Sequence, residues 1–334
     1  MMKLKIALLG FGCVLMFLIN LYFGAVHIPA SEVTASLLGR LNPEETTSFI
    51  IIRNRLPQAL TAFLSGGALS VCGLLLQTSF RNPLAGPSIL GISSGASLGV
   101  AVVMLFFGGV VSIGDNTFGG SAALISGAIA GSMAVMALLI FFSLRIRSNI
   151  MLLIAGMMTG YLTSSVVTLL SSITTAQGIQ SYVVWGMGNF GGVSLDRLPL
   201  FAVLVGIALV ASIMLAKPLN LLLLGDSYAR NLGVNVERVR NKLLITSGVL
   251  TAVVTAYCGP ISFIGIAMPH LARMIFKTDN HFVLMPAVIL AGGMATLLCN
   301  WGMNAIPDRI IPLNALTPIV GVPVILYVIL KGKS

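Results

Sequence analysis

SFRNPLAGPSILGISSGAS, residues 79–97, follows one long apolar run and precedes another. It contains Pro83 and Pro87 together with three glycines and several serines, residue types that interrupt or terminate helices. We therefore expect it to separate a helix that ends near residue 78 from one that begins near residue 89. The apolar runs on its two sides are the first sign of the environment in which this chain folds.

Apolar runs of this kind recur along the whole chain. Of its 334 residues, 57% are hydrophobic and only 8% are charged, whereas a soluble domain carries about 25% charged residues. Because so few charges cannot cover a soluble surface, lipid must solvate much of the protein. The runs are continuous, as in AVILAGGMATLL, rather than alternating with the period of two that marks a spanning β-barrel. The predicted fold class is an all-α, polytopic membrane protein.

A helix needs about 20 apolar residues to cross a bilayer, and this length divides the chain into about ten transmembrane helices. The predicted spans cover residues 5–26, 56–78, 89–109, 119–142, 149–172, 197–216, 242–258, 261–276, 282–303 and 312–330. The seventh and eighth spans are short and are separated by CGPIS, so they could instead form broken or re-entrant helices.

The charges indicate an orientation. Fourteen of the 19 Lys and Arg residues fall in segments that face the cytoplasm if the N-terminus is inside, and five face outward. This bias predicts that both termini are cytoplasmic. The net charge of +10 is spread in short clusters between apolar runs, so nucleic acid is not expected as a partner.

Two parts of the chain are weakly similar to each other. LPQALTAFLSGGALSVCGLLLQ leads through a Gly/Pro break into a second helix, and LLITSGVLTAVVTAYCG does the same before PISFIGIAMPHLARM. In the span assignment the two units enter the membrane from opposite faces. Inverted repeats of this kind are common in transporters.

Groups that carry chemistry are scarce in the predicted spans. All Asp and Glu residues fall between spans, which disfavours a secondary carrier because ion-coupled carriers hold ionisable groups at membrane depth. The sequence has no H-E-x-x-H or G-x-S-x-G motif, and its cysteines are not spaced as metal ligands. We expect no catalytic residue, no metal site and no cofactor bound by this chain, so ATP-driven transport would require a separate ATPase.

KPLNLLLLGDSYARNLGVNVERVRNK, residues 217–242, is the longest inner loop, and it has apolar residues at helical spacing. Gly225 and Gly233 are natural helix breaks, and Asp226 or Ser227 is a plausible N-cap between them. We expect two short helices here, suited either to docking of a cytosolic protein or to lying among the lipid headgroups.

Three arginines in outer segments run against the orientation bias. Arg53 and Arg55 precede the second span, and Arg309 precedes the tenth. They could pair with acidic groups of an external protein or extend to lipid headgroups.

RNPLAGPSILGISSGAS resembles the signature of the FecCD-type family of ABC importers, the permeases for iron chelates and vitamin B12. Further similar segments are RLP at residues 55–57, LLGDSYARNLGV, GPISFIGIAMPHLAR and TPIVGVP. They follow the family's order along nearly the whole chain. The resemblance implies a single transmembrane permease domain over residues 1–334, with the type II ABC importer fold of the vitamin B12 permease and an inverted repeat.

The resemblance also implies partners and a role. Two copies of the permease would form a homodimer around a pathway in the bacterial inner membrane. Two cytosolic ATPases, which hold ATP and Mg²⁺, would dock on coupling helices within residues 217–242, and a substrate-binding protein would deliver the cargo from outside. The permease itself would not be an enzyme. The implied cargo is a ferric siderophore, with haem or vitamin B12 as alternatives.

Three groups of residues take roles from the resemblance. The residues expected to couple the permease to the ATPase are Leu224, Gly225, Asp226, Ala229, Arg230, Leu232 and Gly233. Those of the cytoplasmic signature turn are Arg81, Asn82, Pro83, Leu84, Ala85 and Pro87, with the prolines expected to stop the preceding helix. Those expected to dock the binding protein are Arg53, Arg55 and Arg309.

The chain departs from the family's pattern at the outer surface. Gln58 stands where the family has the second arginine of R-L-P-R, and the residues before the last span depart from D-x-x-A-R and E-L-P-x-G. The corresponding positions are Asn300, Asn304, Ile310, Pro312 and Asn314. These changes alter the surface on which a binding protein would dock.

Overall fold

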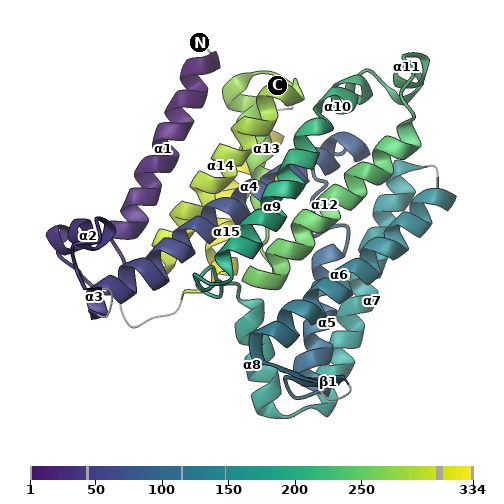
Figure 1. The fold of residues 1–334 in the computed structure, drawn as a ribbon. Coiled ribbons are helices and arrows are strands. Elements are labelled where there is room, and N and C mark those ends of the chain that lie inside the picture. Colours follow the sequence, from purple (N-terminus) through teal and green to yellow (C-terminus); the bar gives the residue numbers. More distant parts are fainter. Residues whose placement is uncertain (1, 43–44, 114–115, 147, 306–310, 332–334) are drawn as a thin grey trace.

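The structure, a computed structural model, describes residues 2–331 apart from 43–44, 114–115, 147 and 306–310. Most of its helices pack side by side into one bundle (Figure 1). In chain order the elements are α1 (Met2–Tyr22), α2 (Ala30–Leu37), α3 (Thr46–Phe49), the π-helical turn η1 (Ile50–Arg55), α4 (Leu56–Phe80), α5 (Ile92–Ala101), the π-helical turn η2 (Val102–Phe106), β1 (Val110–Ile113), β2 (Asn116–Gly119), α6 (Gly120–Arg145), α7 (Asn149–Ile173), α8 (Ala176–Gly186), α9 (Leu198–Met214), α10 (Ala216–Leu223), α11 (Asp226–Asn231), α12 (Val236–Cys258), α13 (Ile264–Phe276), α14 (His281–Met303) and α15 (Leu313–Lys331).

The apolar helices match the predicted spans in order. Among the described residues, six helical segments are long and apolar enough to cross a membrane, and α9 with α10 is a seventh that is bent by 45°. The shorter apolar helices are Ile92–Phe106, Ile264–Phe276 and Leu313–Val328. The seventh predicted span is longer than expected because α12 begins at Val236, and the break at CGPIS separates it from α13. The all-helical membrane fold is therefore confirmed.

The structure also contains elements that the sequence did not predict. Strands β1 and β2 pair as an antiparallel hairpin, and α8 follows α7 after a short turn. Helices α2 and α3 lie beside the end of α1, where Ile28, Val33 and Ile51 form a small separate core. We call residues 24–42 and 45–55 the outer unit.

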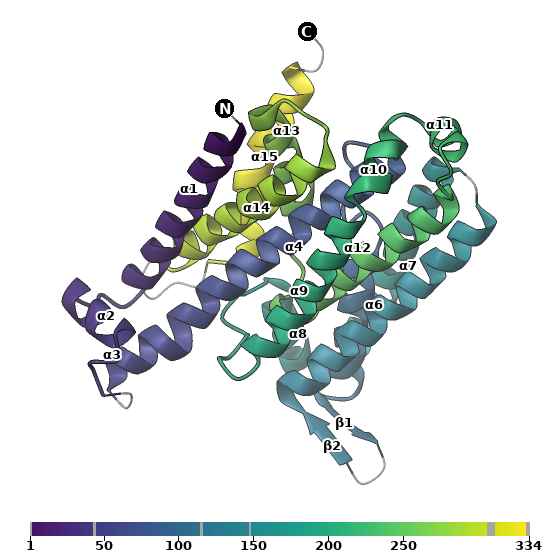
Figure 2. The same cartoon turned by 45° about the horizontal axis from the view of Figure 1, so that its top comes forward.

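The two similar units run through the bundle in opposite directions, as the repeat predicts (Figures 1 and 2). α4 ends close to α11, whereas α12 starts from that end, and each is followed by a break and a shorter helix. The start of α1 and the end of α15 also lie at the end of the bundle that carries α10 and α11, which we call the inner end (Figure 2). The outer unit and the β-hairpin lie at the opposite end, which we call the outer end.

Helix α4 ends before both prolines of the signature turn. Arg81 has a φ of 48°, in the left-handed region, and its N–H and that of Asn82 bond back to carbonyls of the last helical turn. This closure satisfies carbonyl groups that a helix end leaves unpaired. The expectation that proline stops the helix was therefore wrong, because the left-handed residue comes first and Pro83 only prevents the helix from resuming.

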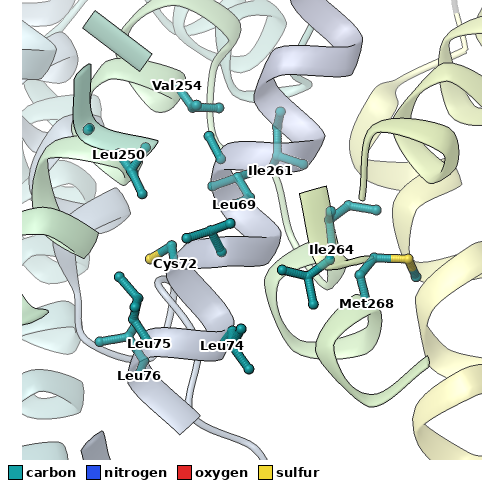
Figure 3. Close-up of a cluster of buried hydrophobic side chains, with 14 of the residues drawn as sticks. Leu69, Cys72, Leu74, Leu75, Leu76, Leu250, Val254, Ile261, Ile264 and Met268 are labelled. Carbon is teal, nitrogen blue, oxygen red and sulfur yellow. The ribbon is translucent and has the colours of Figure 1, made fainter. Parts of the chain in front are cut away.

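Helix α4 is the centre of the packing. Its side chains meet those of α12 and α13 in a buried apolar cluster (Figure 3) that includes Leu69, Cys72, Leu74, Leu75, Leu76, Leu250, Val254, Ile264 and Met268. A Cβ on Gly66 would lie 2.2 Å from the carbonyl oxygen of Gly292, and one on Gly73 would lie 1.5 Å from that of Gly265. Only glycine permits such close approach, so α4 packs backbone against backbone on α13 and α14.

Candidate functional site

The residues expected to couple to the ATPase lie on a bent helical arm at the inner end. Helix α9 turns by 45° into α10, and the short helix α11 follows (Figure 1). Gly225 and Gly233, at the two ends of α11, have φ values of 111° and 83°, a region that glycine adopts without steric cost. Since no described atom lies within 4 Å of a Cβ at either position, the backbone conformation rather than crowding requires glycine.

The predicted helix breaks are confirmed, but the predicted N-cap is not. Helix α11 begins at Asp226 with Gly225 as its cap residue, and no side chain caps it. The cap role of Asp226 or Ser227 was therefore wrong. The segment after Gly233 is not a separate short helix, because it forms the first turns of α12, which Asn235 caps with its side chain.

The arm carries an exposed apolar surface. We call its members the coupling patch: Leu223, Leu224, Tyr228 and Leu232. Leu224 and Leu232 are 60% and 52% exposed, whereas Ala229 on the opposite face of α11 is fully buried. Arg230 and Gly233 are exposed beside the patch. The arm thus packs on the bundle through residues such as Ala229 and exposes an apolar patch that extends from the end of α10 to the residue after α11, as expected at a protein docking site.

The signature turn contacts this arm directly. Arg81 Nη2 lies 2.6 Å from Asp226 Oδ1, and the same nitrogen donates to the Leu222 carbonyl at 3.4 Å. On the other side of the turn, the Nε2–H of His270 in α13 donates to the Pro83 carbonyl at 2.7 Å. Two groups of residues that the sequence predicted separately therefore meet at one junction.

The rest of the signature turn is divided between surface and core. Pro83 and Leu84 are exposed, and Asn82 is half-buried with its Oδ1 accepting the Leu84 N–H at 2.9 Å. Ala85 and Pro87 are buried. The buried half holds the turn on the bundle and leaves the exposed half accessible at the inner end.

Arg55 does not face outward. It is 6% exposed, and its guanidinium donates to the carbonyls of Leu21 and Tyr22 at 2.9 and 3.2 Å and to that of Val26. These groups lie at and just beyond the C-terminus of α1, where carbonyls lack helical partners and the helix dipole favours a positive charge. The structure therefore does not support the docking role expected for Arg55, which instead joins the outer unit to α1.

The other outer residues have varied surroundings. Arg53 is exposed on η1 and stays a docking prediction, whereas Arg309 lies outside the described residues. Asn300 is buried and donates to Asn20 Oδ1 at 2.8 Å. Asn314 donates twice to the C-terminal carbonyls of α8, from its main-chain N–H at 3.1 Å and from Nδ2 at 2.8 Å. Two departures from the family's pattern thus serve bonding between helices.

Helices α7 and α8 expose a polar face that sequence reasoning missed. Its members are Ser164, Ser165, Thr168, Ser172, Gln177, Gln180 and Ser181. The exposed faces of α1 and α9 are apolar, as at Phe11 and Ile207, and suit lipid. Exposed hydroxyls and amides instead favour a water-filled path or a partner protein. The density of Ser, Thr and Gln in SSITTAQGIQS was the signal available in the sequence.

A cavity of about 600 Å³ lies beside this polar face at the outer end. Thr174, Gln177 and Ser181 line it from the α7–α8 side, and Leu105 and Leu124 line it from the other side. Hydroxyl and amide groups on one side and apolar groups on the other therefore border a space large enough for a bulky group.

This arrangement of apolar helices and an inverted repeat, with a bent arm at one end, is typical of a membrane transport protein. The chain matches the model of the FecCD transport family over residues 12–331, and it belongs to that family.

Named relatives and a solved structure agree with this assignment. The chain is 34% identical over 279 residues to the vitamin B12 import system permease protein BtuC of Salmonella paratyphi A, covering 83% of this chain and 82% of that protein. It is 35% identical, with the same coverage, to the BtuC protein of Salmonella typhi. A solved inward-facing structure assigned to the metal-chelate type of ABC transporter superposes with a TM-score of 0.84 at 29% identity, covering 98% of this chain and 99% of that one.

Family membership defines the kind of subunit. The chain is the permease of an ABC importer and is not itself an ATPase. A permease of this kind works with an ATPase and a binding protein. Such a role requires surfaces for partner proteins and for the cargo. The exposed coupling patch and the polar face of α7 and α8 are the candidates.

Proposed function

We propose that two copies of this chain form the pathway of a ferric siderophore importer in the bacterial inner membrane, together with two cytosolic ATPases and an external substrate-binding protein. The coupling patch carries the proposal, because it is an exposed apolar surface on and beside a short helix that is bounded by two glycines. The ATPases hold ATP and Mg²⁺, and this chain supplies the surface that they move.

The distribution of charge supports a cytoplasmic inner end. Arg81, Arg230, Arg240, Arg273 and Lys277 belong to the segments at this end. Because short cytoplasmic loops carry the excess of Lys and Arg, both termini then face the cytoplasm and the outer unit faces the external partner.

In the proposed cycle, ATP binding draws the two ATPases together and displaces α11. The left-handed glycines Gly225 and Gly233 allow α11 to reorient without straining the helices on either side. The contact between Arg81 and Asp226 passes this movement to the signature turn. The spans then rock between outward-open and inward-open states.

The polar face of α7 and α8 supplies the pathway in this proposal, one face from each copy. Its hydroxyls already bond within their own helix, as Ser165 does to the Tyr161 carbonyl and Thr168 to the Ser164 carbonyl, both at 3.0 Å. The surface therefore offers weak, replaceable contacts rather than a tight binding site. A bulky chelate held by shape can pass along such a surface without being trapped.

Vitamin B12 is the second candidate cargo. The specific observation in its favour is the identity of 34% and 35% to proteins named as vitamin B12 import permeases. A corrinoid and a ferric siderophore are both bulky chelates, so the same uncharged path suits either.

Uptake into proteoliposomes separates these candidates. The permease is reconstituted with its ATPase and binding protein, ATP is supplied on the ATPase side, and labelled ferrichrome, haem or cyanocobalamin is offered on the other side. We expect ATP-dependent uptake of ferrichrome that disappears when either partner is omitted. Uptake of cyanocobalamin alone would reassign the cargo, and uptake without ATP would overturn the proposal in favour of a secondary carrier.

A further inference from the structure

A chain of three polar side chains joins the bent arm to the centre of the bundle. Asn220 belongs to α10, His281 is the first residue of α14, and Thr78 lies near the end of α4. Asn220 Oδ1 is 2.8 Å from His281 Nδ1, and His281 Nε2 is 2.8 Å from Thr78 Oγ1. His281 and Thr78 are buried, so water does not compete for the second contact.

Neighbouring groups fix the donors and acceptors along this chain. Asn280 Oδ1 caps α14 by accepting the Phe282 N–H at 3.0 Å, so the Asn220 nitrogen that lies 2.9 Å from the same oxygen must donate to it. Asn220 Oδ1 therefore accepts both the main-chain N–H and the ring Nδ1–H of His281, each at 2.8 Å. In the neutral ring, Nε2 is left as the acceptor, and the Thr78 hydroxyl donates to it.

We infer that Asn220, His281 and Thr78 form a relay of positioning residues that carries movement of the bent arm to α4. This inference rests on the proposed function, in which an ATPase displaces α11. Both polar groups of the Asn220 side chain form hydrogen bonds with the start of α14. Helix α10 and the start of α14 therefore move together. Thr78 is the point where this movement reaches α4, which packs backbone against backbone on α13 and α14.

Threonine suits a contact that must break and form again. The Thr78 hydroxyl has a second acceptor, the Leu74 carbonyl at 3.0 Å in its own helix. When the start of α14 withdraws, the hydroxyl turns to that carbonyl, so no buried donor is left without a partner. A cavity of about 340 Å³ lined by Thr78, Arg81 and Leu222 leaves space for the movement.

A matched pair of substitutions tests the relay. Thr78→Val removes the hydroxyl with little change of shape, and Thr78→Ser keeps it. The control is Thr251→Val, because Thr251 is also buried, donates to the Ser247 carbonyl at 2.8 Å in its own helix and lies 3.2 Å from a side-chain partner, Cys72 Sγ. The control removes an equivalent hydroxyl from α12, where it does not contact the arm.

The measurement is the ATP-driven change in conformation of the full transporter in lipid nanodiscs. A spin label is attached through Leu144→Cys, an exposed site at the inner end of α6, while the four native cysteines are buried. The distance between the two labels of the dimer is compared without nucleotide and after trapping with ATP and vanadate. ATP hydrolysis is measured on the same samples.

We expect Thr251→Val and Thr78→Ser to switch as the wild type does. In Thr78→Val the unswitched state loses a buried hydrogen bond that the switched state does not make. ATP hydrolysis therefore persists, while the ratio of switched to unswitched transporter without nucleotide rises about tenfold, the scale expected for one buried hydrogen bond. His281→Asn keeps the contact to Asn220 but cannot reach Thr78, so it has the same effect and adds nothing to Thr78→Val.

Two outcomes would overturn the relay. In the first, Thr78→Val has the same ratio of switched to unswitched transporter without nucleotide as Thr251→Val, while the wild type responds to ATP, which leaves the proposed function standing. In the second, the effects of His281→Asn and Thr78→Val add independently. A wild-type transporter that binds no ATPase or shows no response to ATP would overturn the proposed function and the relay together.

Discussion

The inner and outer ends of the bundle hold their helices together in different ways. At the outer end, Arg55 and Asn314 donate to main-chain carbonyls at the ends of α1 and α8. At the inner end, contacts between side chains are added to such main-chain contacts, as Arg81 makes with Asp226 and His281 with its two partners. The capping bonds at the outer end are therefore fixed, whereas the side-chain contacts at the inner end can be exchanged.

The energetic reason lies in the alternatives open to each group. A carbonyl at a buried helix end has no other partner when its donor leaves, so it bears the full desolvation penalty. Arg81 and Asp226 are half-exposed and turn to water when they separate, and the Thr78 hydroxyl has a second acceptor in its own helix. The moving part of the transporter is accordingly expected at the inner end.

The largest effect is expected from a charge in the coupling patch. Leu232→Glu places a carboxylate where an apolar ATPase surface must dock, and we expect uptake to fall to background and the ATPase to dissociate on purification. Leu38→Glu is the matched control, because Leu38 is as exposed but lies on the outer unit. If the Leu232→Glu variant retained the ATPase, the coupling patch would not be the surface on which the ATPase docks.

The next effect is a loss of stability at the outer end. Arg55→Ala leaves carbonyls at the end of α1 without a donor, and we expect the free energy of unfolding to fall by about 2–3 kcal/mol, as for lost bonds to a charged group. Thermal unfolding in detergent measures it. Arg53→Ala is the control. We expect it to leave stability unchanged because Arg53 is exposed, and to lower the affinity for the binding protein instead. Equal stability of the two variants would contradict the capping role of Arg55.

A smaller effect is expected from the cap on α8. Asn314→Ala removes the Nδ2 bond and keeps the main-chain bond, which should cost about 1 kcal/mol and speed amide exchange at the end of α8. The comparison variant is Asn304→Ala. The Asn304 side chain donates to the Asn300 carbonyl, four residues earlier in the chain, at 2.9 Å. Unchanged exchange in α8 after Asn314→Ala would remove Asn314 from the fixed outer contacts.

The smallest change in stability is expected from the ion pair at the inner end. Arg81→Ala and Asp226→Ala should each cost less than about 1 kcal/mol of stability, because exposed pairs contribute little, while uptake falls about threefold. The double variant should transport no worse than either single variant. Additive losses in uptake would mean that the two residues act separately and that the junction does not transmit movement.

The sequence predicts what depends on local pattern. Continuous apolar runs predict the spans, because burial in lipid needs only length and hydrophobicity. Gly225 and Gly233 are predicted as breaks because a left-handed backbone at both positions excludes most other residues. The end of α4 was predicted to within two residues, but its cause was not, because the left-handed Arg81 closes the helix before the first proline.

What the sequence does not predict depends on contacts between distant segments. Arg55 reads as an exposed outer charge until the end of α1 is brought beside it, more than 30 positions earlier in the chain. Thr78 lies 203 positions and Asn220 61 positions from His281 in the chain, so the three residues form no motif. Helix α8 was missed because its 11 residues are too few to cross a membrane, and the elements were predicted from apolar runs long enough to do so.

Hydrogen exchange on the permease in lipid, alone and with its ATPases bound, tests the central claim most directly. We expect ATPase binding to slow exchange across residues 221–235, which carry α11 and the whole coupling patch, and to leave the outer unit unchanged. Slower exchange in the outer unit, or an unchanged exchange rate across residues 221–235, would contradict the assignment of docking and movement to the inner end.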